Sequence, residues 1–223
     1  MPILHLYDKL LQFSLFQGMS RDDLELVAGH TRFGFSKIER GKVLVRDGDP
    51  CHNMCFLING QLEMETVAVD HSYSVTERIA APNLLQPEAI FGLNQRYTHT
   101  FTALTDANFI TVDKDEVMHL AEDFLVFRIN LLNLFATTAQ KSLLQPWRHC
   151  PRTLDDRIIR FFAQHCLYPA GHKTFRILMT RLADELNDSR LDVSRALNRL
   201  EDSGKIVLHR GRIEIPSMEA LLM

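Results

Sequence analysis

Close to residue 113 the hydrophobic pattern of the chain changes from alternation to helical spacing, and this change limits the folds open to it. Between residues 31 and 112, short alternating runs are separated by turns such as "RDGDP" and "NG". Many short strands divided by turn residues are typical of a β-sandwich or barrel. We expect strands at "FGFSKI", "KVLV", "MCFLI", "QLEMETVAV", "YSVTERIA", "TFTAL" and "NFITV".

After residue 113, apolar residues recur every three or four positions as far as residue 144, which predicts one long helix with a heptad seam. A helix of about 30 residues would be ~45 Å long, more than a small domain can cover. We therefore expect the helix to pair with a second copy of the chain. The predicted dimer interface consists of Val117, Leu120, Phe124, Phe127, Leu131, Leu134 and Thr138.

Helix caps and prolines predict the remaining boundaries. Ser20, followed three residues later by Asp23, predicts a capped N-terminal helix. Pro146 and Pro151 should end the helix between Gln145 and Arg152, which predicts an interdomain hinge there. The expected parts are a sensor domain of residues 1–113, a dimerisation helix and hinge of residues 114–147, and a C-terminal domain of residues 148–223.

The C-terminal domain has the pattern of a winged helix-turn-helix: helix, strand "FRIL", helix, tight turn "NDS", helix and a short hairpin. Thr180 is expected to cap the first helix of the motif, and Ser189 the second, with Asp192 at its third position. At 100° per residue, the second helix has two faces. Val193, Ala196, Leu197 and Leu200 fall on the apolar face, and the arginines fall on the other.

Arginines on a helix face are often just a solvated surface, but here the motif around them favours DNA binding. The first turn of such a helix enters the major groove, where Arg pairs with guanine and an exposed Leu can meet a thymine methyl. Although the chain carries a net charge of −3, its last 74 residues hold 12 Lys and Arg against 10 Asp and Glu. The candidate DNA contacts are Thr180, Ser189, Arg190, Leu191, Ser194, Arg195, Asn198, Arg199, Arg210 and Arg212.

Two stretches resemble the CRP/FNR family of bacterial transcription regulators. "ERGKVLVRDGDPCHNMCFLINGQLEM" is similar to the opening of that family's β-roll, and "SRLDVSRALNRLEDSGKI" to its recognition helix. The resemblance covers nearly the whole chain and implies an α+β fold: a jelly-roll-like double-stranded β-helix, a long dimerisation helix and a winged helix-turn-helix. The residues at the β-roll spacing are Gly41, Leu44, Gly48, Asp49, Phe56, Leu57, Ile58, Gly60 and Leu62.

The resemblance also implies a function. Ser189 matches the family's phosphate-contacting serine, and Arg190 and Arg195 match its base-reading arginines. Leu191 departs from the glutamate of many relatives, so the operator need not be the familiar half-site. The implied protein is a homodimer that binds a roughly two-fold symmetric DNA operator, with RNA polymerase as a further candidate partner. The alternative is a small-molecule sensor that acts through protein contacts, with the winged helix as a docking module.

The ligand site of the sensor domain is the weakest match. Relatives that bind cyclic AMP place an Arg-Ser pair where this chain has Tyr97 and Thr98, so we do not expect cyclic AMP to bind. Glu88 and Arg96 would have to shift to replace the missing groups. The chain would then represent a branch without the intact cyclic AMP phosphate-binding motif. Either Glu88, Arg96, Tyr97 and Thr98 line a site for an unidentified small ligand, or the pocket is filled by Phe91 and Phe101.

Cysteine usage and motifs argue against other classes. The four cysteines, Cys51, Cys55, Cys150 and Cys166, lack the double CxxC spacing of a metal site and are expected to be buried free thiols. The first 50 residues lack the cysteines of an iron-sulfur sensor, and haem is a weaker option. We find no catalytic motif and expect no enzyme, cofactor or metal. Without a signal peptide or an apolar span, the expected location is the bacterial cytoplasm.

Overall fold

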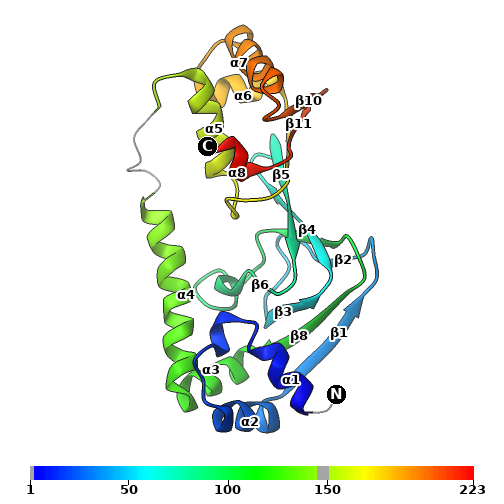
Figure 1. Cartoon of the computed structure of the whole chain (residues 1–223), viewed down its shortest axis with the longest axis vertical. Helices are drawn as coiled ribbons and strands as arrows, with labels where there is room; N and C mark the ends of the chain where they lie inside the picture. The colour runs from blue at the N-terminus through cyan, green and yellow to red at the C-terminus, as the bar shows by residue number, and fades with distance from the viewer. Residues whose placement is uncertain (1–2, 145–150) are drawn as a thin grey trace. The chain divides into compact units, whose positions relative to one another are not determined.

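The structure is a computed structural model that describes residues 3–144 and 151–223. It divides into two compact units (Figure 1). The first consists of residues 1–62 and 79–146, and the second of residues 63–78 and 147–223. The second unit therefore contains a hairpin that comes from the middle of the expected sensor domain.

The first unit is a β-roll with helices at its ends. Its four-stranded antiparallel sheet has the order β1-β8-β3-β6, and β2 pairs with β7. Four consecutive residues of β3, Met54 to Leu57, are buried, and Phe109, Ile110 and Val112 of β8 are buried beside them. The elements are α1 (Ile3–Leu10), η1 (Ser14–Phe16), α2 (Arg21–His30), β1 (Phe33–Ile38), β2 (Val43–Val45), β3 (Asn53–Asn59), the start of β4 (Gln61–Val67), β6 (Asn83–Leu85), η2 (Pro87–Ile90), β7 (Thr100–Ala103), β8 (Ala107–Asp113), α3 (Lys114–Asp123) and α4 (Leu125–Leu144).

The expected single long helix is two helices, which corrects the sequence prediction. Phe124 has extended backbone angles, φ −119° and ψ 103°, and ends α3 before α4 begins at Leu125. After this break α4 packs on η1. The ring centroids of Phe16 and Phe127 are 5.3 Å apart, and Asn130 Nδ2 donates to the carbonyls of Leu15 and Gln17 at 3.1 and 2.9 Å.

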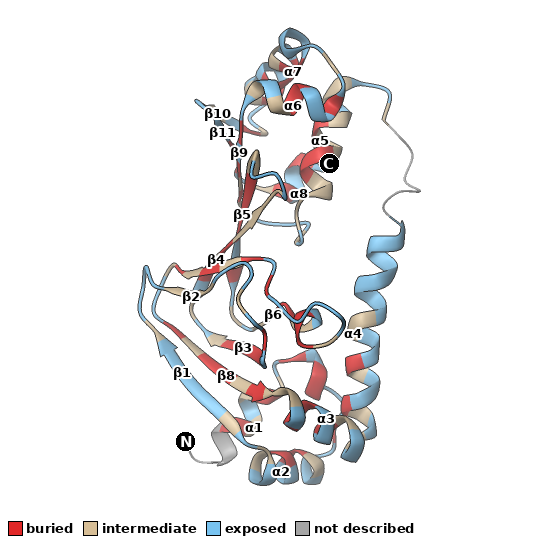
Figure 2. Cartoon of the chain, turned by 180° about the vertical axis from the view of Figure 1, so that it is seen from behind, coloured by how far each residue is buried: buried red, intermediate tan, exposed pale blue. Residues whose placement is uncertain are grey.

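This packing also changes the predicted dimer seam. Val117, Leu120, Phe127 and Leu131 are buried inside the first unit, so their side chains have no surface left for a partner. Phe124 and Leu134 are half-buried, and exposed Thr138 donates its hydroxyl hydrogen to the Leu134 carbonyl at 3.1 Å. The apolar residues do recur at helical spacing, but they form the face of α3 and α4 that packs within the first unit. Figure 2 shows that much of α4 nevertheless remains exposed.

The second unit is the winged helix-turn-helix. Its antiparallel strands have the order β10-β11-β9-β5, and its core is built around Phe162, Phe175, Leu182 and Leu197. The elements are the outer part of the hairpin of β4 and β5 (Tyr73–Ala80), α5 (Leu154–Gln164), β9 (Lys173–Ile177), α6 (Met179–Leu186), α7 (Arg190–Asp202), β10 (Val207–His209), β11 (Arg212–Ile215) and α8 (Met218–Leu221).

The β4–β5 hairpin is an integral part of this unit. β5 pairs with β9 from Tyr73↔Ile177 to Glu77↔Lys173, and Val75 lies in the same core as the helix-turn-helix. Glu77 and Lys173 form a fully buried ion pair at 2.7 Å, and the Glu77 carboxylate also accepts the backbone N–H groups of Leu167 and Tyr168. Val75 and Glu77 are therefore part of the interior of the C-terminal unit.

Candidate nucleic-acid interface and sensor site

The helix-turn-helix is formed by α6, a turn and α7. Asn187 ends α6 in the left-handed conformation, φ 48° and ψ 53°, which asparagine tolerates better than most residues. The Ser189 side chain then accepts the backbone N–H of Asp192 at 3.1 Å, so the predicted cap of α7 is confirmed. The predicted cap of α6 is wrong: Leu178 occupies the N-cap position without a side-chain bond, and exposed Thr180 lies inside the first turn.

The two predicted faces of α7 are confirmed. Val193, Ala196, Leu197 and Leu200 are buried against the rest of the unit. The residues of the other face are exposed, apart from half-buried Ser194: Arg190, Leu191, Arg195, Asn198 and Arg199. The guanidinium groups are thus held on a rigid helix by the apolar contacts behind it.

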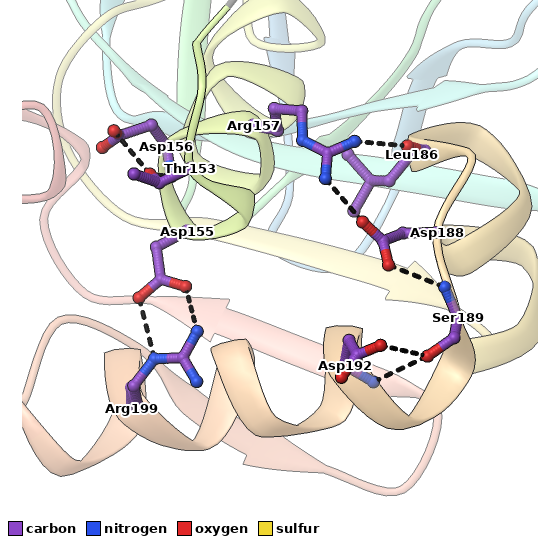
Figure 3. A network of polar contacts seen from close by, with 9 residues as sticks. All are labelled: Thr153, Asp155, Asp156, Arg157, Leu186, Asp188, Ser189, Asp192 and Arg199. Atoms are coloured by element: carbon purple, nitrogen blue, oxygen red, sulfur yellow. Dashed lines mark hydrogen bonds and ion pairs between the residues drawn. The ribbon is translucent and has the colours of Figure 1, made fainter.

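Arg199 differs from the other arginines because it is already paired. Its guanidinium contacts both carboxylate oxygens of Asp155 on α5, with Nε at 3.0 Å from Oδ2 (Figure 3). This contact raises the pKa of Arg199 and neutralises its charge locally. Arg199 therefore ties α7 to α5, a role that the sequence pattern of α7 alone did not indicate.

A second network fixes the turn before α7. Arg157 donates to the Leu186 carbonyl at 3.1 Å and to Asp188 Oδ2 at 2.5 Å (Figure 3). Asp188 also accepts the backbone N–H of Ser189 at 2.8 Å, and this bond, with Arg157, lowers the pKa of Asp188. The start of α7 is therefore fixed by charge-assisted contacts from α5. Arg157 and Asp188 were not among the predicted residues.

Arg190 and Arg195 are the more available cations of α7. Arg195 approaches Asp192 only at 3.5 Å, with both side chains largely exposed. Within residues 3–144 and 151–223, no side chain forms a hydrogen bond or ion pair with Arg190. The Ser189 hydroxyl, by contrast, donates to Asp192 Oδ2 at 2.6 Å, so it is already engaged.

The predicted wing is the β10–β11 hairpin. Its turn consists of Arg210 and Gly211, and Gly211 has φ +71°, a conformation that favours glycine. Arg212 Nη2 forms an ion pair with Glu214 Oε1, two residues along β11, at 3.1 Å. Exposed Arg210 has no side-chain partner among the described residues, so its charge projects from the tip of the wing.

In the sensor domain the four predicted ligand residues do not form one cluster of available groups. Tyr97 is buried, with its ring centroid 6.4 Å from that of Phe101. Thr98 forms two hydrogen bonds with the Gln86 side chain: its hydroxyl accepts from Nε2 at 2.7 Å, and its backbone N–H donates to Oε1 at 3.0 Å. Arg96 is exposed and donates to the Gly48 carbonyl at 2.6 Å, while Glu88 is exposed on η2.

The cysteines are free thiols, as expected, where the structure describes them. Cys51 and Cys55 are buried and Cys166 is half-buried. Burial raises the pKa of Cys55 and of Cys166 to about 12, so both thiols are protonated at neutral pH and are poor nucleophiles. Cys150 and most of the predicted hinge, residues 145–150, lie outside the described residues.

Comparison with known families adds the deciding observation. Residues 35–124 match the cyclic nucleotide-binding domain, and residues 156–223 match the Crp-like helix-turn-helix domain. The chain is a DNA-binding transcription regulator of the CRP/FNR type. Regulators of this type are not enzymes, they contain a ligand-sensing domain, and they are typically dimers.

Solved structures share the fold of this CRP/FNR-type regulator. The catabolite activator protein of Thermus thermophilus is 20% identical, with a TM-score of 0.53 over 94% of this chain and 96% of that one. A putative CRP/FNR regulator from Eubacterium rectale is 18% identical, with a TM-score of 0.53 over 95% and 97%. The sensor domain of the regulator DNR from Pseudomonas aeruginosa is 16% identical, with a TM-score of 0.53 over 68% and 97%. No curated protein gives a significant match.

One further property concerns membranes. In the part of the chain that the structure describes, no helix combines the length and the apolar composition needed to span a bilayer.

Proposed function

We propose that this CRP/FNR-type regulator binds, as a homodimer, an approximately two-fold symmetric DNA site, with one α7 in each of two successive major grooves. The observation that carries the proposal is the outer face of α7, where Arg190 and Arg195 are exposed and only weakly engaged. Arginine in this position pairs with two acceptors of guanine. Exposed Leu191 is suited to a thymine methyl, which gives the operator a different preference from that of relatives with glutamate.

The other predicted contacts take supporting roles. Arg210 at the tip of the wing is suited to a phosphate, and Arg212 can join it if it leaves Glu214. Thr180, Ser194 and Asn198 remain candidates for backbone or base contacts on the same side of the motif. Arg199 acts instead through Asp155, by fixing the angle of α7.

The dimer surface that we propose lies on the solvent side of α4. The exposed residues there follow one another in steps of four and three, which is the spacing of a coiled-coil seam. They are Leu125, Ile129, Leu132, Ala136, Ala139 and Leu143. Four of the six are leucine or isoleucine, and a parallel pair of α4 helices would bury them all. This seam replaces the one predicted from the sequence.

We further propose that cyclic AMP is not the effector, which would place the protein in a branch without the intact phosphate-binding motif. The support is local: Tyr97 and Thr98 stand where the Arg-Ser pair would be, and the Thr98 hydroxyl already accepts a hydrogen bond from Gln86 Nε2. An anionic cyclic phosphate would thus meet a buried phenol rather than a guanidinium. Mass spectrometry of the natively purified protein would identify an alternative ligand that it carries.

The experiment that tests DNA binding is operator selection followed by salt titration. We expect the wild-type affinity to fall steeply with added salt, because phosphate contacts release counterions. Arg190→Ala and Arg195→Ala should each remove base preference while leaving the dimer intact. Arg40→Ala is the matched control, since Arg40 is an exposed arginine of the first unit. Salt-insensitive binding, or unchanged base preference in both α7 variants, would contradict the proposal and favour a protein-docking module.

A further inference from the structure

A loop of the first unit exposes an apolar side chain to solvent. Leu93, between η2 and β7, is fully exposed. Gly92 before it has φ +86°, a conformation that other residues rarely adopt. Gln95 closes the turn by donating from Nε2 to the Gly92 carbonyl at 3.2 Å. The exposure of Leu93 thus follows from a defined turn.

The same loop is attached to α4 through Phe91. The ring of Phe91 meets that of Phe135 edge to face, with centroids 6.1 Å apart, and the ammonium group of Lys114 lies 5.5 Å from its centroid. Both cartoon views place this loop beside the middle of α4 (Figures 1 and 2). Leu93 is two residues from that attachment point.

The position of Phe135 on the helix places the loop at the border of the proposed seam. In a heptad with Ile129, Ala136 and Leu143 at position a, Phe135 occupies position g. The g positions flank the seam of a coiled coil and face the e positions of the partner helix. A loop bound to Phe135 therefore lies along the line where a second α4 would approach.

We propose that Leu93 packs against α4 of a second copy of this chain, near residues 136–140, so that the β-roll loop forms part of the dimer interface. The inference rests on the dimer proposed above and extends its surface beyond the helix. The occupant is a second copy because Leu93 is two residues from Phe91, Phe91 contacts Phe135, and Phe135 is next to exposed Ala136 of the proposed seam.

Sedimentation equilibrium of the full chain tests the inference. We expect Leu93→Asn to raise the dissociation constant of the dimer by about tenfold or more, because the dimer buries this side chain twice. Phe35→Thr is the control: Phe35 is an exposed apolar residue on β1, at the edge of the same unit away from α4 (Figure 1). It should leave the dissociation constant unchanged. Thermal unfolding of both variants checks that each chain folds.

Leu132→Asp separates this inference from the dimer itself. If Leu132→Asp dissociates the dimer but Leu93→Asn does not weaken it, the α4 seam stands and the loop contact is wrong. If the wild-type chain is a monomer, both proposals fail.

A photo-crosslinker placed at residue 93 gives an independent readout. In an equal mixture of light and isotope-labelled chains that have exchanged subunits, we expect crosslinks from residue 93 to α4 peptides in mixed-isotope pairs. Crosslinks only within chains of one isotope, or none to α4, would overturn the inference.

Discussion

The carboxylate of Glu77 on β5 lies 2.7 Å from the ammonium group of Lys173 on β9, and neither side chain is exposed to solvent. Opposite charges at this depth are tolerated because each has a partner and because the carboxylate accepts two further backbone N–H groups. The pair joins a hairpin from the middle of the chain to the DNA-binding unit.

Removing one member of this pair should be strongly destabilising. We expect Lys173→Met to lower the free energy of unfolding by about 3–5 kcal/mol, because it leaves the Glu77 charge buried without a cation. Arg176→Met breaks the exposed pair with Glu65 in the same sheet and should cost at most about 1 kcal/mol. Urea unfolding measures both. Equal losses in the two variants would contradict the argument from burial.

Two arginines of the DNA-binding unit should differ in their effect on salt dependence. Arg210→Ala should reduce the slope of log affinity against log salt by about 1, since it removes one phosphate contact. Arg199→Ala should leave this slope nearly unchanged, because Asp155 already neutralises that charge. Fluorescence anisotropy over a series of salt concentrations distinguishes them. A loss of slope in Arg199→Ala would show that Arg199 leaves Asp155 on binding.

Adjacent leucines of α4 should separate folding from association. Leu131→Ala empties a buried position and should lower the free energy of unfolding by about 2–5 kcal/mol. Leu132→Ala removes an exposed side chain, so it should weaken the dimer while leaving the unfolding of the isolated chain almost unaffected. Denaturation at several protein concentrations measures both quantities. If Leu131→Ala weakened the dimer and Leu132→Ala lowered the free energy of unfolding, the seam predicted from the sequence would be supported instead.

Cyclic AMP should bind weakly or not at all. A ligand at 100 times its dissociation constant stabilises a folded protein by about 2.7 kcal/mol, which a thermal melt detects readily. We expect no such shift with cyclic AMP, because Tyr97 and Thr98 offer no cation to the phosphate. A clear rise in melting temperature or operator affinity would show that Arg96 or another cation turns into the pocket.

The strands and the helix-turn-helix could be predicted because their signals are local. "FGFSKI" and "YSVTERIA" coincide with β1 and β5, and the Ser189 cap of α7 follows from the residues beside it. β6 was missed, because it has only three residues and little room for alternation.

Errors in the prediction came from contacts between distant segments. The spacing from Val117 to Thr138 shows that a helix has an apolar face, but not whether η1 or a second chain covers it. Likewise, the angle of Arg199 on α7 shows that it points outward, while Asp155 lies 44 residues away on another helix. The Thr180 cap failed because α6 begins at Met179, two residues earlier than a cap at Thr180 would require.

The contribution of β5 to the DNA-binding unit limits where the protein can be cut. A fragment starting at residue 147 would expose the edge of β9, with unpaired backbone groups, and would leave the Lys173 ammonium alone in an apolar interior. Such a fragment should aggregate rather than bind DNA. Chimaeras with related regulators should therefore transplant residues 63–78 together with the helix-turn-helix.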